Sequence, residues 1–229
     1  ISSRPAWRQR AEQKEKATQF IIEEVRRLNA DLTGFMNFAR PKPPEIKPVD
    51  LGELAERTVS VWKMSSGGGD LRAPSGEGAA VQPGSPDTVS SPSVAVNVTV
   101  APGTPLAAAD RDQVHQVLLN LVLNATQAIS AAGGKGTRVD VMVRPEGTRV
   151  ALIVADDGPG MPDDVRAHAF EPFFTTKKRG SGLGLAVVDQ VIRAHGGSLV
   201  LESKPGEGTR FTLLFPSTAS AALSATMRS

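Results

Sequence analysis

The sequence predicts an α+β fold, a two-layer α/β sandwich in which helices cover a mixed sheet. Its first part has the apolar spacing of helices. Its second part alternates helix-like segments with pairs of strand-like segments joined by short polar turns. This order of elements is typical of helices packed on one face of a sheet. A long, coiled-coil-like helix is expected to precede the sandwich.

The composition is that of an ordinary globular protein, with 40% apolar and 22% charged residues among 229. A net charge of +2 gives no reason to expect nucleic acid as a partner. The absence of cysteine excludes disulfides and suits a reducing, cytoplasmic location. No apolar run approaches the roughly 20 residues of a membrane-spanning helix. Because the chain opens at Ile1 without a methionine, we expect a longer parent protein, which can still be membrane-anchored.

The first domain is expected to be a helix within residues 1–40. Its apolar residues lie 4, 3, 4, 3 and 4 positions apart, a heptad pattern that predicts pairing with another helix, as in a homodimer. These residues are Ile21, Val25, Leu28, Leu32, Phe35 and Ala39. The alternative is one amphipathic helix lying on its own domain. Three prolines end the helix, and residues 41–50 are expected to form a linker.

The second domain is expected over residues 51–216. It begins with a helix that Asp50 caps, and a longer helix follows Asp110, with Gln113 at capping-box spacing. Residues 65–92 are rich in Gly, Ser and Pro, which predicts a flexible insertion. The predicted elements are helices at 51–64, 110–132 and 183–195, a strand at 94–100, hairpins at 138–144/149–155 (turn 145–148) and 198–203/209–215, and a disordered tail at 217–229.

A first candidate site lies on the helix after Asp110. Asn120 and Asn124 are one turn apart and present two amide oxygens on one helix face. Magnesium prefers oxygen ligands and takes further oxygens from phosphate and water. An isolated asparagine pair is more often a solvated polar face, so this interpretation depends on the downstream segments.

A second candidate is Asp156, which follows the apolar run of residues 150–154 and therefore stands at the end of a strand. Its carboxylate can accept a hydrogen bond from an exocyclic amine such as that of adenine. Gly158 and Gly160 allow the backbone to turn sharply and to approach a flat ring. Alone, the same residues are equally consistent with a tight turn.

A third candidate is the glycine loop before the helix at 183–195. Gly180, Gly182 and Gly184 leave room for phosphate, which the N–H groups of a helix N-terminus attract. Lys177, Lys178 and Arg179 add positive charge. The loop is neither a P-loop nor a dinucleotide fingerprint. Residues 161–179 are expected to form a lid, anchored by Phe170, Phe173 and Phe174.

In chain order, "NLVLNATQAI", "DDGPGMP", "FEPFFTTK" and "GSGLGLAVV" resemble the N, G1, F and G2 boxes of sensor histidine kinases. "HGGSLVLESKPGEGTRFTLLFP" resembles the closing hairpin of their ATP-binding domain, so the resemblance covers residues 94–216 and implies a GHKL-type ATPase fold. "EEVRRLNADLTGFMNFARP" is similar to the second helix of the dimerisation and phosphotransfer hairpin of nitrogen-regulation-type kinases.

The resemblance implies that the chain binds ATP and Mg²⁺ and acts in a two-component system. Asn124 is then the principal magnesium ligand and Asn120 its neighbour, while Asp156 recognises the adenine amine. The other nucleotide-binding residues implied are Gly158, Gly160, Met161, Phe170, Lys177, Gly180, Gly182, Leu183, Gly184, Leu185 and Thr209. The implied partners are the acceptor-histidine helix of the parent kinase, a response regulator and a second copy of the chain.

One departure concerns the acceptor histidine, which the family carries on the first hairpin helix before an Asn-Pro pair. His115, His168 and His195 all lack that context, and each is expected to be structural. The expected function is therefore ATP-dependent transfer to a histidine missing from this chain. One alternative is a non-catalytic, nucleotide-binding scaffold. Another is a hydrolytic ATPase of the gyrase and MutL group, but those carry a glutamate where this sequence has Asn120.

Overall fold

The computed structural model describes residues 42–66, 94–133, 136–177 and 180–220. The expected helix within residues 1–40 lies outside the described residues. So do nearly all of the insertion at 65–92, most of the tail at 217–229, and Lys178 and Arg179.

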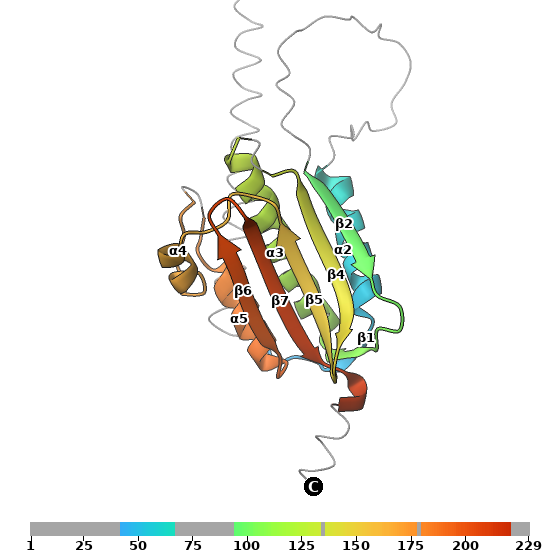
Figure 1. Ribbon diagram of the computed structural model, residues 1–229. Coiled ribbons are helices and arrows are strands. Elements are labelled where there is room, and N and C mark those ends of the chain that lie inside the picture. The colour runs from blue at the N-terminus through green and yellow to red at the C-terminus, as the bar shows by residue number, and fades with distance from the viewer. Residues whose placement is uncertain (1–41, 67–93, 134–135, 178–179, 221–229) are drawn as a thin grey trace, which may run out of the picture.

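The described residues form the predicted two-layer sandwich. Helices α2, α3 and α5 all lie behind the five-stranded sheet, on one of its faces (Figure 1). The strand order is β2-β4-β5-β7-β6; β2 pairs parallel with β4, and the other pairs are antiparallel, so the sheet is mixed as predicted. The elements are β1 (Lys47–Val49), α2 (Leu51–Ser66), β2 (Ala95–Val100), β3 (Ala107–Ala109), α3 (Arg111–Ala131), β4 (Arg138–Glu146), β5 (Arg149–Asp156), α4 (Asp163–His168), α5 (Gly184–Ala194), β6 (Ser198–Lys204) and β7 (Gly208–Pro216).

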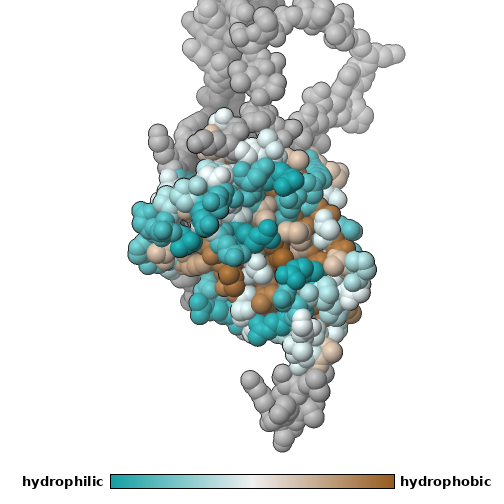
Figure 2. All heavy atoms as spheres, in the orientation of Figure 1, coloured by the Kyte–Doolittle hydropathy of each residue, from teal (hydrophilic) through white to brown (hydrophobic). Residues whose placement is uncertain are grey.

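The core lies between the sheet and the helices. Alternate residues of β5 and β7 face it in register, since Leu152 pairs with Leu213 and Val154 with Phe211. The predicted apolar stripe of α3 is buried against them; it consists of Val114, Val117, Leu118, Leu121, Val122, Ala125 and Ile129. Figure 2 shows the uncovered face of the sheet, where apolar residues gather among polar ones. No helix that the structure describes has the length and apolarity needed to cross a bilayer.

The first hairpin has a shorter turn than predicted. The register of β4 and β5 continues to Glu146 and Arg149, so only Gly147 and Thr148 form the turn, and Gly147 has the left-handed φ of 59°. Pro145 was expected in the turn but continues the strand. It can do so because β2 pairs with β4 only as far as Val143, so the missing N–H of Pro145 interrupts no ladder on that side.

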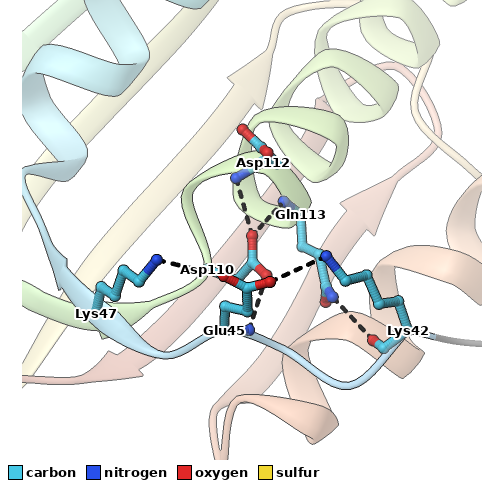
Figure 3. A network of polar contacts seen from close by, with 6 residues as sticks. All are labelled: Lys42, Glu45, Lys47, Asp110, Asp112 and Gln113. Carbon is cyan, nitrogen blue, oxygen red and sulfur yellow. Dashed lines mark hydrogen bonds and ion pairs between the residues drawn. The ribbon is translucent and has the colours of Figure 1, made fainter.

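The linker is fastened to the N-terminus of α3 by Asp110 (Figure 3). Oδ1 of this buried carboxylate accepts hydrogen bonds from the N–H groups of Asp112 (3.0 Å) and Gln113 (3.2 Å), and Oδ2 accepts one from Glu45 N (2.9 Å). Asp110 is thus the N-cap that the sequence predicts. The reciprocal half of a capping box is absent, because the Gln113 side chain donates to Lys42 O at 2.9 Å instead.

His195 completes this junction from α5. Its Nε2 accepts a hydrogen bond from Asp110 N at 2.9 Å, and its Nδ1 lies 2.7 Å from Val191 O. A backbone N–H can only donate and a carbonyl can only accept, so Nε2 of the buried ring is the acceptor and Nδ1 carries a proton. The prediction that His195 is structural agrees with this arrangement.

Candidate nucleotide-binding site

The amide pair on α3 is partly exposed, and each amide oxygen already has a donor. Asn120 Oδ1 accepts from Gln116 Nε2 at 3.1 Å, whereas Asn124 Oδ1 accepts from Lys177 Nζ at 2.8 Å. Asn120 Nδ2 lies 3.5 Å from Gly184 O, a weak contact. The two oxygens therefore do not share one partner among the described residues.

The glycine loop lies against this face of α3. A Cβ on Gly184 would be 3.9 Å from Asn124 Nδ2, so the two segments approach each other closely. Gly182 has a φ of 68°, and a Cβ there would lie 2.4 Å from the backbone carbon of Phe173, whose N–H donates to Gly182 O at 3.0 Å. Only glycine fits this turn. α5 then begins with Leu183 at its N-cap, which has no polar side chain to satisfy the first N–H groups of the helix.

Lys177 reaches α3 from the segment before the glycine loop. Its ammonium donates to Asn124 Oδ1 and to Gln127 Oε1, each at 2.8 Å. Desolvation of the ammonium lowers the pKa of Lys177 from its ordinary value. Asn124, Lys177 and Gly184, which come from three sequence segments, are thereby brought together.

Two adjacent carboxylates, Asp156 as the last residue of β5 and Asp157 directly after it, have different environments. Burial raises the pKa of Asp156, although Oδ1 accepts a hydrogen bond from Gly158 N at 3.0 Å and the carboxyl also interacts with the Thr209 backbone. Burial by itself would also raise the pKa of Asp157. Hydrogen bonds from Arg138 N and Thr137 N, each 2.8 Å long, outweigh it and hold the pKa of Asp157 below its usual range. Asp157 therefore fastens the loop to β4.

The loop after Asp156 is packed on the closing hairpin. Gly160 has a φ of +66°, and a Cβ on it would lie 1.9 Å from Lys204 O. Gly208, on the hairpin, has a φ of +85°, and its Cβ would lie 2.0 Å from Asp156 O. Both contacts join backbone to backbone, so any larger residue would separate the loop from the hairpin.

A buried serine that the sequence analysis did not single out holds these parts together. Ser203 Oγ accepts a hydrogen bond from Met161 N at 2.9 Å, lies 2.9 Å from Gly208 O and is 3.1 Å from Thr209 Oγ1. The signal for it was its register, because Ser203 follows Leu199 and Leu201 on the core-facing side of β6.

A pocket of about 460 Å³ opens at this end of the sheet. Its lining includes Asp156 and Thr209, together with Ala155, Arg166, Leu201, Glu202, Ser203, Lys204, Glu207, Gly208 and Arg210. A larger pocket, of about 510 Å³, lies between the linker, α3 and α5 and is lined by none of the predicted nucleotide-binding residues. The smaller pocket is the better candidate because it contains the desolvated carboxylate. Asn120, Asn124 and the glycine loop lie outside its lining.

The phenylalanines of the predicted lid do not all act as anchors. Phe170 packs against the core and contacts Phe211 edge-on, with ring centroids 6.5 Å apart. Phe174 lies beside His168 at 5.7 Å. Phe173 is 62% exposed and has a left-handed φ of 68°, so its predicted anchoring role is wrong in this conformation. Of the remaining predicted residues, Leu183 is buried, Met161 and Leu185 pack against the core, and Gly180 is exposed.

The donor set fits a magnesium ion that arrives with a nucleotide. Among the described residues, no group of three or more His, Cys, Asp or Glu side chains could hold a metal on its own. Asn124 Oδ1 nevertheless holds a cation already, the Lys177 ammonium. A neutral amide oxygen that binds an ammonium can serve a hard cation whose other ligands are phosphate and water.

Comparison with known proteins agrees with this arrangement. Residues 109–219 match the family described as Histidine kinase-, DNA gyrase B-, and HSP90-like ATPase. The sensor histidine kinase ZraS of Klebsiella oxytoca is 33% identical over 197 residues, which are 86% of this chain and 37% of ZraS. The sensory histidine kinase/phosphatase NtrB of Rhodobacter capsulatus is 31% identical over 208 residues, 87% of this chain and 52% of NtrB. The chain thus spans only about a third to a half of the length of these relatives.

Solved structures share the fold. The catalytic domain of histidine kinase ThkA is 25% identical with a TM-score of 0.57, and the match covers 76% of this chain and 96% of that domain. Full-length ShkA in complex with AMPPNP is 23% identical with a TM-score of 0.66, covering 95% of this chain and 41% of ShkA. Residues 109–219 therefore contain the domain of the histidine kinase-, DNA gyrase B- and HSP90-like ATPases, and the chain is similar to the ATP-binding catalytic part of sensor histidine kinases.

Proposed function

We propose that this chain binds Mg-ATP and transfers the γ-phosphate to a histidine other than the three in its sequence, for relay to a response regulator. The observation that carries the proposal is the meeting of Asn124, Lys177 and Gly184, which brings an amide oxygen, an ammonium and a glycine turn to one place. Oxygen ligands, positive charge and open backbone are what a magnesium-bound triphosphate requires.

Each part of the nucleotide has a proposed partner. Asp156 accepts the hydrogen bond of the adenine amine, and Thr209, Gly158 and Gly160 support that end of the pocket. The N–H groups at the start of α5 bind the phosphates. When bound, magnesium would neutralise phosphate charge, with Asn124 as its principal protein ligand and Asn120 beside it. Catalysis then depends on positioning and charge neutralisation.

The environments of the three histidines support an acceptor elsewhere. His195 is buried and held by two backbone groups. His115 Nδ1 lies 2.7 Å from Thr58 Oγ1 and is thus engaged within the helical layer. His168 is exposed, and its hydrogen bond with Glu171, 2.8 Å long, raises the pKa of His168. His168 is therefore the one histidine that a labelling experiment must exclude.

The cellular setting is proposed on the same basis. A domain that uses ATP works where ATP is abundant, which favours a cytoplasmic location, and a membrane anchor of the parent protein is compatible with it. ThkA has been solved in complex with the response regulator protein TrrA, which supports a response regulator as a partner. Dimerisation through residues 1–40, beside the acceptor helix, rests on the heptad spacing.

The test combines binding with transfer. Calorimetric titration should show Mg-ATP binding by the parent chain and much weaker binding by Asn124→Ala. Incubation with γ-labelled ATP should leave the chain itself unlabelled. A supplied helix with the family's His-Glu-x-x-Asn-Pro sequence should acquire acid-labile, base-stable label. Label on His168, or ATP binding without transfer to any supplied acceptor helix, would contradict the proposal, and the second result would favour a non-catalytic scaffold.

A further inference from the structure

The contact between Lys177 and α3 is a cation site built from neutral groups. The Lys177 ammonium lies 2.8 Å from Asn124 Oδ1 and 2.8 Å from Gln127 Oε1. An ammonium can only donate, so both amides must turn their oxygens toward it. Asn124 and Gln127 lie three positions apart on α3 and therefore face the same side of the helix.

This environment differs from that of the other lysines whose contacts are described. Lys42, Lys47 and Lys204 each form an ion pair with a glutamate. No ion pair among the described residues includes Lys177, so two amide dipoles hold its positive charge without a carboxylate to neutralise it. A magnesium ion also needs a hard oxygen ligand, and at the same oxygen it would carry twice the charge of the ammonium.

We propose that the Lys177 ammonium occupies the metal-binding oxygen, Asn124 Oδ1, until a magnesium-bound nucleotide displaces it. The inference rests on the proposed function, in which Asn124 is the principal magnesium ligand. One oxygen of this geometry cannot bind an ammonium at 2.8 Å and also a second cation in the same direction. Lys177 and magnesium therefore compete, and Lys177 sets how much magnesium the site requires.

The size of the effect follows from the population of the occupied state. Apparent affinity falls in proportion to the fraction of molecules in which the site is free. Two amide–ammonium hydrogen bonds at a partly hydrated position keep that fraction low enough to raise the magnesium requirement by roughly 3- to 10-fold. Weakening the Lys177 contact should thus lower the magnesium concentration needed for nucleotide binding.

Gln127 provides the sharpest variant, since it contacts Lys177 and has no part in the proposed nucleotide contacts. Gln127→Ala removes one of the two oxygens that hold the ammonium, leaves Asn124 in place and introduces the residue with the best helix propensity at an exposed position. Gln190→Ala on α5 and Lys63→Gln on α2 are matched controls, since neither residue contacts Asn124 or Lys177 in the described hydrogen bonds.

The experiment measures the binding of a fluorescent ADP by anisotropy while magnesium is titrated. Half-saturation should require roughly 3- to 10-fold less magnesium in Gln127→Ala than in the parent, with no change in either control. An unchanged or increased magnesium requirement in a folded Gln127→Ala protein would overturn the proposed competition between Lys177 and magnesium. Failure of the parent to bind nucleotide at any magnesium concentration would instead refute the proposed function on which the inference rests.

Discussion

At the residue scale, Asp156 and Asp157 show how one sequence motif provides two different carboxylates. The backbone of Arg138 and Thr137 donates to Asp157 and holds it ionised, which commits this side chain to fastening the loop. Asp156 is desolvated in the wall of a pocket and receives fewer donors. A desolvated acceptor discriminates strongly between ligands that donate a hydrogen bond to it and ligands that do not.

Asp156→Ala should therefore weaken ATP binding by roughly 10- to 150-fold near neutral pH, since a hydrogen bond to a charged group contributes ~1.5–3 kcal/mol. Burial raises the pKa of Asp156, so the carboxylate is lost on acidification earlier than an ordinary aspartate would be. The affinity of the parent relative to that of Asp156→Ala should therefore decrease as pH falls through that raised pKa. The variant lacks this carboxyl, so its own pH dependence reports titration of the nucleotide. Calorimetry at several pH values provides the measurement. Equal binding of ATP and GTP by the parent would refute the role in adenine recognition.

At the element scale, the junction at Asp110 joins the linker to the two helices that flank the candidate site. This one residue forms hydrogen bonds with Glu45 N–H, with two N–H groups of α3 and with His195 at the end of α5. Burial opposes ionisation of Asp110, but its hydrogen bonds from the Glu45, Gln113 and Asp112 backbone outweigh that effect and lower its pKa below the ordinary 3.8. The ionised form is thus the one that stabilises the junction.

Asp110→Asn should lower the free energy of unfolding by ~1–3 kcal/mol at neutral pH. Asparagine caps a helix about as well as aspartate, but its single oxygen cannot serve both α3 and Glu45 N. Because the folded pKa is lowered, the contribution is complete above pH 3.8 and disappears as pH falls through the folded value. Urea unfolding of parent and variant between neutral and acid pH measures both effects.

Asp50→Asn is the matched control for this prediction. Asp50 caps α2 through Oδ1 alone, accepting from Gly52 N at 2.8 Å and Glu53 N at 3.0 Å. Asparagine can reproduce that arrangement, so little stability should be lost. If both variants lost the same stability, the second oxygen of Asp110 would have no special role in fastening the linker.

At the scale of the whole molecule, one core supports the site. α2 and β2 flank the 65–92 segment in sequence, and both contribute buried residues to that core, including Leu54, Val59 and Val96. The site in turn depends on contacts between distant segments, such as Gly160 with Lys204 and Lys177 with Asn124. Largely the same segments of the chain therefore build both the core and the site.

Replacement of residues 65–92 by a short Gly-Ser linker should leave the melting temperature nearly unchanged, because their composition offers few large apolar side chains for a core. A long connection adds little closure entropy relative to a short one, so shortening it should have only a small effect. Thermal unfolding followed by circular dichroism checks this expectation. A drop of many degrees would mean that the segment packs against the sandwich.

The sequence alone determined the fold class and the positions of the main elements. Apolar spacing along α3, the apolar run of β5, the alternation along β7 and glycines at the turns are local patterns, and each is dictated by the geometry of one helix, strand or turn. The motif order also placed Asn124, Asp156 and Gly184 among the candidates. The turn at 145–148 was predicted too long because the end of the β2–β4 pairing, which permits Pro145 in the strand, is not a local property.

Only the tertiary structure decided how those residues are used. Asp156 and Asp157 are neighbours of the same type, and only the approach of Thr137 and Arg138 distinguishes them. The Ser203 hydrogen bonds, the Lys177 contact with Asn124 and the Asp110–His195 junction join residues from different elements. Such contacts form when separate segments pack around a common core. Helical and strand periodicity constrain residues only a few positions apart, so they leave these pairings undetermined.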